Sequence, residues 1–246
     1  AVYGDRPVGS PGMISVLSPE DLQRLPNDHP AEALNFLAGV NIQMNSQQEH
    51  LIAIRSPVLT GGAGPGSFLL LENGVPMRAP AFGNVNGLID AHNEISSGVE
   101  VVKGPGSARY GSNAVHGLVN YHQPEPGETD TWLDLSASTH ERFDADGVAG
   151  FSVGGADGLL GLTLSTDKGW RDESGADQQK ATFRLKGDIG GWDALASLVY
   201  VNLNQETAGY VDDYEDEDLI ETNPNPEAYR DARTTRGYVH FSRELG

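Results

Sequence analysis

The second half of the chain alternates apolar and polar residues. In "TWLDLSAST", Leu133, Leu135 and Ala137 occupy every second position, opposite Trp132, Asp134 and Ser136. The same period recurs in "VAGFSVGG", "GLLGLTLST", "KATFRLKGD", "WDALASLVYVNLN" and "RGYVHFSRE". Because successive side chains of a β-strand point to opposite faces of a sheet, this pattern predicts about six strands between residues 131 and 246.

Short and long connections alternate between these strands. Tight turns are predicted at 154–158 ("GGADG") and 187–191 ("GDIGG"), and longer connections at 140–146, 167–179 and 204–233. Short turns on one edge and long loops on the other are typical of outer-membrane β-barrels. A soluble β-sandwich also fits the alternation, so the pattern alone leaves both architectures open.

The first half, up to about residue 128, mixes element types. Ser18, with Pro19 and Asp21 after it, predicts the start of a short helix, and "PAEALNFLAGV" predicts a second helix that ends at Gly39. Strands are predicted in "NIQMNSQQEHLIAIR", "GSFLLLENGVPM", "GVEVVKG" and "HGLVNY", and the dipeptide Asn73-Gly74 predicts a turn. This half is therefore expected to be a small α+β domain with long loops.

Composition removes several classes of function. The chain of 246 residues carries 16 Lys and Arg against 35 Asp and Glu, a formal charge of -19, which disfavours nucleic acid as a partner. It contains no cysteine, so disulfides and thiolate metal sites are excluded. No apolar run approaches the roughly 20 residues of a transmembrane helix, although this does not exclude a β-barrel.

The motifs that would indicate an enzyme or a cofactor are missing. "KGPGSARYGS" has neither of the glycine spacings that hold nucleotide phosphates. The histidines show no HExxH spacing for zinc, and the acidic stretch "DDYEDEDL" lacks the spacing and glycine of a calcium-binding EF-hand. We therefore expect no enzymatic activity, no cofactor and no metal site, and a solvated loop at the acidic stretch.

Four motifs in order carry a family resemblance. "ALNFLAGVNI", "LIAIRSP", "FLLLENGVPM" and "GVEVVKGPGSARYGSNAVHGLVNY" together resemble the plug domain of TonB-dependent outer-membrane receptors over residues 14–124. Ser56, Glu72-Asn73, Lys103 and Leu118 depart from the usual residues of these motifs. The departures put individual plug contacts in doubt more than the fold.

The resemblance implies an α+β plug domain at residues 1–128, followed at 129–246 by antiparallel β-strands of an incomplete outer-membrane β-barrel. Barrels of this family have about 22 strands. About six strands cannot close around a plug, and an open edge is not tolerated in lipid. The chain is therefore interpreted as an N-terminal fragment of a receptor.

The function implied is an energy-coupled outer-membrane transporter of a Gram-negative bacterium, gated by its plug. The resemblance implies a scarce nutrient or metal chelate as substrate, namely an iron-siderophore, a cobalamin or an oligosaccharide. It also implies outer-membrane lipid and a TonB-type energy-coupling protein of the inner membrane as partners; "AVYGDRPVGS" does not convincingly contain the coupling segment. The alternative is a soluble β-rich binding or adhesion module.

Two sets of candidate residues follow. By resemblance, Arg55, Glu100 and Lys103 form a charged network within the plug and between plug and barrel, because buried charges need partners. The loops 56–67 and 78–94 rise toward the substrate side in the family. Their candidate substrate contacts are Arg78, Phe82, Asn84, Asn86 and His92. The alternative for both loops is a glycine-rich surface without a ligand.

Overall fold

The structure is a computed structural model that describes residues 13–25, 28–45, 47–58, 67–79, 86–211 and 217–243. The chain divides into two compact units, Ala1–Gln123 and Pro124–Gly246. The boundary predicted from the sequence lies slightly later, after residue 128. No helix in the described ranges has the length and hydropathy needed to cross a bilayer.

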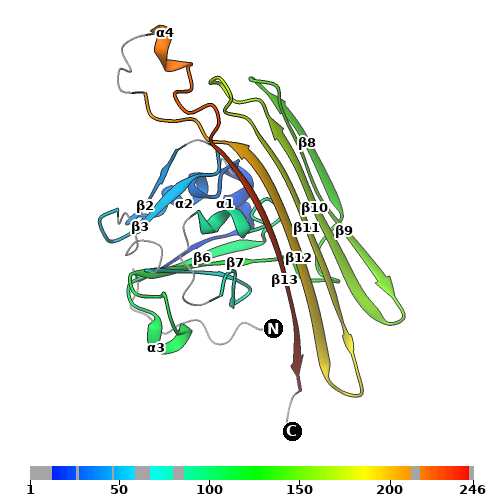
Figure 1. The fold of residues 1–246 in the computed structure, drawn as a ribbon. Helices are drawn as coiled ribbons and strands as arrows, with labels where there is room; N and C mark the ends of the chain where they lie inside the picture. Colours follow the sequence, from blue (N-terminus) through cyan, green and yellow to red (C-terminus); the bar gives the residue numbers. More distant parts are fainter. Residues whose placement is uncertain are drawn as a thin grey trace. The chain divides into compact units, whose positions relative to one another are not determined.

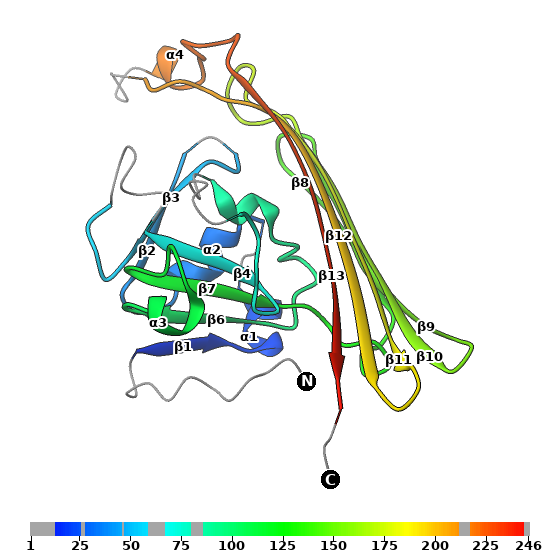
Figure 2. The ribbon, with the colours of Figure 1, turned by 60° about the horizontal axis from the view of Figure 1, so that its bottom comes forward.

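The first unit is built on a five-stranded sheet with the strand order β1-β6-β7-β4-β5 (Figures 1 and 2). Strands β4 and β7 pair in parallel, and the other neighbours are antiparallel. Its strands are β1 (Ile14–Leu17), β4 (Phe68–Glu72), β5 (Val75–Pro76), β6 (Gly98–Lys103) and β7 (Gly117–His122).

A separate antiparallel hairpin and short helical segments complete the part of this unit that the structure describes. The hairpin pairs β2 (Val40–Met44) with β3 (His50–Ile54). The helical segments are α1 (Pro19–Arg24), α2 (Pro30–Asn35), the 3-10 turn η2 (Gly87–Asp90) and α3 (Ser107–Tyr110). One buried cluster joins helix, hairpin and sheet, and its members include Leu34, Ile42, Ile54, Phe68, Leu70, Leu88, Val101, Val119 and Tyr121. The predicted α+β domain is confirmed.

The helix boundaries follow from their caps. The predicted helix start at Ser18 is confirmed, and Ser18 and Asp21 form a capping box of α1, with Pro19 in its first turn. The prediction that the second helix ends at Gly39 is wrong, because α2 ends at Asn35. The Asn35 amide bonds both backbone groups of Ile42, at 2.7 and 2.9 Å, and so fixes the chain's return into β2. Gly39 takes the left-handed conformation in the loop between them, with φ 81°.

The second unit is one six-stranded sheet in which chain neighbours pair antiparallel, in the order β13-β12-β11-β10-β9-β8 (Figure 1). Its strands are β8 (Trp132–Ser138), β9 (Arg142–Val153), β10 (Ala156–Asp167), β11 (Ala176–Asp188), β12 (Asp193–Glu206) and β13 (Tyr229–Ser242), and α4 (Glu217–Ile220) lies between the last two. The strands predicted from the alternation are confirmed, as is the fold class of a plug-like unit followed by an unclosed antiparallel sheet.

One predicted loop is a strand instead. Residues 140–146 were expected to connect two strands, but β9 already begins at Arg142. Asp144 and Asp146 made this segment resemble a loop, yet both carboxylates accept hydrogen bonds inside the sheet. Ser165 Oγ donates to Asp144 and Thr163 Oγ1 donates to Asp146, each at 2.5 Å. Satisfied in this way, both acidic side chains fit the polar face of a strand.

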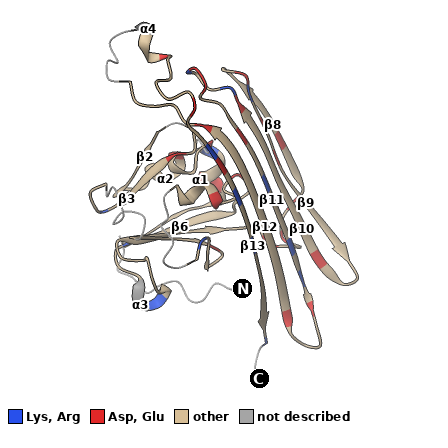
Figure 3. Cartoon of the chain, in the orientation of Figure 1, with Lys and Arg blue, Asp and Glu red and all other residues tan. Residues whose placement is uncertain are grey.

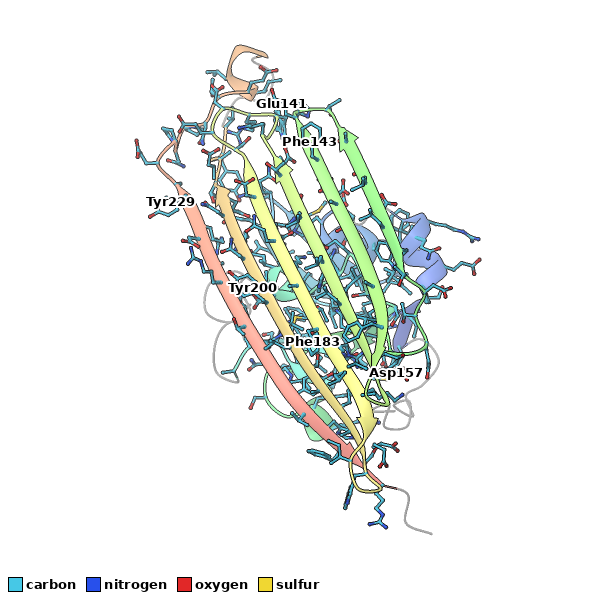
Figure 4. The ribbon with its side chains drawn as sticks, turned by 90° about the vertical axis from the view of Figure 1, so that its right-hand side faces the viewer. Glu141, Phe143, Asp157, Phe183, Tyr200 and Tyr229 are labelled. Atoms are coloured by element: carbon cyan, nitrogen blue, oxygen red, sulfur yellow. The ribbon has the colours of Figure 1, made fainter. Side chains whose placement is uncertain are left out.

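The two faces of the second sheet differ in chemistry. One face presents large apolar side chains to the outside; its members include Leu133, Leu135, Phe143, Leu160, Leu162, Leu164, Phe183, Leu198, Tyr200, Val239 and Phe241. Figure 4 shows this face, with Glu141 and Asp157 at opposite ends of the sheet. The other face is mainly polar and includes Asp144, Thr163, Gln178, Lys180, Thr182, Arg184 and Arg236. An outward apolar face opposite a polar face is the arrangement of strands in an outer-membrane barrel.

The β8–β9 turn offers a direct test of hairpin strain. His140 and Glu141 both have positive φ, at 61° and 53°, within the three residues that connect Ser138 to Arg142. Non-glycine side chains pay for this conformation, whereas the pair Asn-Gly adopts it readily. The double variant His140→Asn, Glu141→Gly is therefore expected to raise the free energy of unfolding of the sheet by about 1–2 kcal/mol.

The measurement is urea unfolding followed by tryptophan fluorescence, because Trp132, Trp170 and Trp192 are the chain's 3 tryptophans and all lie in the second unit. The double alanine variant at 140 and 141 is the control, since alanine keeps the unfavourable φ. Equal stability of both variants would contradict the strain argument.

Candidate functional site

The segment around the candidate loop 78–94 is fixed by an ion pair within the first unit. Arg78 Nε donates to Asp90 Oδ2 at 2.6 Å. The Asp90 side chain is 2% exposed and that of Arg78 is 27% exposed, so the pair lies at the edge of the plug core. A carboxylate buried to this degree needs its charge partner, and Arg78 therefore holds the start of the segment against its end.

A buried histidine fixes the same segment at a second point. Asn86 has a left-handed backbone, with φ 51°, and its Oδ1 accepts the backbone N–H of His50 at 2.8 Å. The backbone N–H of Leu88 donates to His50 Nε2 at 3.2 Å. Because Nε2 accepts, the ring proton of neutral His50 sits on Nδ1, which lies 2.9 Å from the carbonyl oxygen of Gln48. His50 thus joins β3 to η2 through two hydrogen bonds, and the third orients its ring from Gln48.

The third contact of this segment involves the end of the plug. His92 is fully buried, and its carbonyl oxygen accepts from Ser96 Oγ at 2.9 Å and from Gln123 Nε2 at 3.0 Å. Gln123 Nε2 also lies 3.1 Å from Glu72 Oε2. The backbone around His92 therefore belongs to a buried polar network.

These contacts give the described candidates a structural role. Arg78, Asn86 and His92 all have hydrogen-bond partners inside the plug, and the latter two are buried. Phe82 and Asn84 lie outside the described residues. Substrate contact through any of the five stays a prediction, and so does the alternative of a surface without a ligand.

The second candidate set lies within the first unit, where the side chains of Arg55 and Lys103 come together beside Gly39. Lys103 Nζ donates to Ser15 Oγ at 2.7 Å and to the carbonyl oxygen of Ala38 at 3.0 Å, so it joins β6 to β1 and to the α2–β2 loop. Glu100 lies 3.8 Å from His122 Nε2 across the β6–β7 pair. Arg55 has a positive φ of 48°, and its side chain packs against Gly39. The role of these three residues between plug and barrel stays a prediction.

Burial gives Lys103 a pH signature. Desolvation lowers the pKa of its ammonium, and the nearby Arg55 guanidinium lowers it further, from an ordinary value of 10.5. The unfolded chain therefore holds this proton more tightly than the folded plug does. Below the lowered pKa the group reduces plug stability, and this cost is relieved as the pH rises through that pKa toward 10.5.

We expect Lys103→Met to lose this pH dependence while filling the same space. The measurement is urea unfolding of the plug at pH values from 7 to 10.5. Unfolding is detected through the labelling of a cysteine introduced at Ser97, because the chain contains no other cysteine. The difference in stability between native chain and variant should shift in favour of the native chain as the pH rises. A difference that does not change with pH would contradict the prediction.

In the second unit, two of the long loops are joined to each other. Arg171 donates through Nε and Nη2 to the carbonyl oxygen of Thr222, at 3.1 and 2.6 Å. The backbone N–H of Asp172 donates to the carbonyl oxygen of Glu221 at 2.7 Å, and Asn223 Nδ2 donates to that of Glu173 at 2.8 Å. The β10–β11 and β12–β13 loops therefore form one hydrogen-bonded structure, from which Trp170 projects with 56% exposure.

The polar face of the second sheet carries both signs of charge. Figure 3 shows basic and acidic residues distributed along its strands. Arg142 bonds Asp144 with two nitrogens, at 2.8 and 3.1 Å. Arg184 donates to the carbonyl oxygen of Pro124 and, at 3.2 Å, to Glu125. In the described ranges, no group of three or more His, Cys, Asp or Glu side chains is arranged to hold a metal ion.

The roles of His50, Asp90 and Gln123 were not predicted from the sequence. Apart from the local contact of His50 with Gln48, the partners named above lie between 12 and 51 residues away along the chain. A buried histidine or glutamine next to an apolar strand was the available signal. That signal does not identify the partner.

Comparison with known proteins connects this geometry to a family. Residues 6–118 match the family model of the TonB-dependent receptor plug domain. Solved structures similar to the chain include the ferric citrate transporter FecA in its unliganded form, with 18% identity and a TM-score of 0.71, covering 87% of this chain and 34% of that one.

Two further solved structures agree in fold. The ferric-catecholate import receptor Fiu from E. coli K12 has 14% identity and a TM-score of 0.70, with 98% of this chain and 37% of that chain covered. FpvA of P. aeruginosa bound to heterologous pyoverdines has 13% identity and a TM-score of 0.74, with 97% and 32% covered. The chain thus spans about a third of the length of these structures. Residues 6–118 thus match the plug domain of TonB-dependent receptors, and the fold of the chain resembles that of these solved receptors.

Proposed function

We propose that this chain is the plug and first barrel strands of an outer-membrane transporter that takes up a scarce nutrient with energy supplied from the inner membrane. The observation that carries the proposal is the order of the two units. A plug domain of the receptor family is followed at once by an antiparallel sheet with one apolar, exposed face. Such a face is suited to lipid, and the alternative of a soluble binding or adhesion module would have to cover it.

An iron chelate is the substrate class that the similar structures favour. Their names include a ferric citrate transporter, a ferric-catecholate import receptor and a pyoverdine-bound receptor. The joined loops at Arg171 and Asn223 supply an ordered surface on which a chelate can be held. Uptake of a cobalamin or an oligosaccharide in place of the iron chelate is the other outcome of the same test.

The test expresses a complete receptor carrying this chain in a Gram-negative host that lacks its own iron-chelate receptors. We expect the protein in the outer-membrane fraction, and uptake of a radiolabelled ferric chelate that stops when the host's TonB-type coupling protein is deleted. Cobalamin and an oligosaccharide are measured in parallel. A protein recovered as a soluble monomer without detergent would overturn the proposal.

A further inference from the structure

The peptide bond between Gln123 and Pro124 joins the two units of the chain, and each side of it is anchored. We propose that this junction is a fixed point of the receptor, at which the end of the plug stays in place while other parts of the plug move. The inference deepens the proposed function and rests on it for its meaning in transport.

On the plug side, Gln123 is fully buried and uses both its backbone and its side chain. Its backbone N–H donates to Asn73 Oδ1 at 2.9 Å. Its side-chain nitrogen lies within hydrogen-bond distance of Glu72 Oε2, the His92 carbonyl oxygen and Ser96 Oγ, at 3.1, 3.0 and 3.4 Å. The last residue of the plug is thus bonded to β4, to the β4–β5 turn and to the 92–96 segment.

The β4–β5 turn is itself bonded back to β7, which ends just before Gln123. Asn73 and Gly74 have φ values of 49° and 78°, as expected for an Asn-Gly hairpin turn. The backbone N–H of Asn73 donates to the Tyr121 carbonyl oxygen at 2.8 Å, and that of Gly74 donates to Asn120 Oδ1 at 2.9 Å. Asn73 therefore accepts from Gln123 and donates to Tyr121, which closes the network around the chain's exit.

On the sheet side, the very next residue is held by β11. Arg184 donates through Nη1 to the Pro124 carbonyl oxygen, and its Nη2 lies 3.2 Å from Glu125 Oε1. Lys186 on the same strand lies 3.9 Å from Glu125 Oε2. Bonds to charged groups are stronger than those between neutral groups, so these contacts resist displacement.

No flexible linker separates the two anchors, because the anchored residues are consecutive. A force that displaces the plug must break buried hydrogen bonds at Gln123, or those of Arg184, before this end can move. Losing one partner of a buried group costs its desolvation as well as the bond. The junction is therefore expected to be among the last parts of the plug to open.

The experiment is native-state hydrogen exchange on the purified complete receptor in detergent. We expect the backbone amides of Asn73, Gly74 and Gln123 to be among the last of the plug to exchange. Gln123→Ala should accelerate exchange at Asn73 and Gly74 by about tenfold or more, since it leaves the Glu72 carboxylate without this donor.

Three further variants separate the effect of the anchor from that of general stability. Asn73→Gly keeps the turn backbone but deletes the acceptor for Gln123, so exchange at Gln123 should accelerate while the β4–β5 turn persists. Asn73→Asp keeps an oxygen acceptor and tolerates positive φ, and should retain most of the protection. Arg184→Met is expected to accelerate exchange in residues 125–128 and to leave Asn73 protected.

Early exchange at Asn73 and Gln123 in the native receptor, ahead of the rest of the plug, would overturn the anchor. This measurement needs no substrate and no energised membrane. A receptor that keeps this protection but transports neither chelate, cobalamin nor oligosaccharide contradicts the proposed function and leaves the anchor standing. The two ideas therefore fail separately.

Discussion

Replacing Leu162 with arginine is expected to reduce the folding free energy of the membrane-inserted receptor by about 2–4 kcal/mol. Leu162 lies near the middle of β10 on the apolar face and is 45% exposed. If this face contacts lipid, an arginine there loses its hydration in the hydrocarbon layer. The measurement is urea unfolding of the complete receptor from lipid bilayers, with the yield of folded protein in the outer membrane as a second readout.

The matched control is Thr166→Arg, on the same strand and the same face but next to its end at Asp167. The cost of an arginine falls to about 0–1 kcal/mol near the membrane interface, so this variant should fold almost normally. Equal effects at both positions would indicate that depth is irrelevant. The apolar face would then be covered by something other than a bilayer.

Strands with a regular alternation of apolar and polar residues were predictable from sequence. In β10, Leu160, Leu162 and Leu164 occupy every second position. This period does not depend on tertiary contacts, because successive side chains point to opposite faces and one face of the sheet is removed from water. Asn73-Gly74 was equally predictable, since few other dipeptides fit two consecutive residues with positive φ. In both cases the physical cause lies within a few residues of the chain.

Features that depend on distant partners were not predictable. The start of β9 was missed because Asp144 and Asp146 resemble a loop until their donors Ser165 and Thr163 on β10 are known. The early end of α2 depends on a bond between Asn35 and Ile42, after the chain has turned back. In each case a polar side chain is satisfied by a tertiary hydrogen bond, and this hydrogen bond cannot be inferred from the local sequence pattern.

The candidate site divides in the same way. Family resemblance directed attention to the segment around Arg78, Asn86 and His92. The structure assigns these residues partners inside the plug: Asp90, His50 and Gln123. Residue type alone could not distinguish a side chain that holds a loop from one that holds a substrate, because both need a polar group beside a glycine-rich segment.

Arg78→Ala is expected to open the segment around η2, because it removes the guanidinium that lies 2.6 Å from the buried Asp90 carboxylate. Removing one partner of a buried ion pair costs about 3–5 kcal/mol, although the partial exposure of Arg78 places the effect at the lower end. About 3 kcal/mol corresponds to an acceleration of roughly a hundredfold in the hydrogen exchange of the Ile89 and Ala91 amides. Exchange in β6 should stay close to that of the native chain.

Arg78→Lys is the control that separates structure from recognition. Lysine keeps the positive charge near Asp90 but loses the planar guanidinium, so most of the protection at Ile89 and Ala91 should return. If Arg78 mainly contacts substrate, the alanine variant would instead keep native exchange rates and lose chelate uptake. Because a variant that opens the segment also disturbs any surface built on it, loss of uptake alone does not identify a ligand contact; loss of uptake with unchanged exchange does.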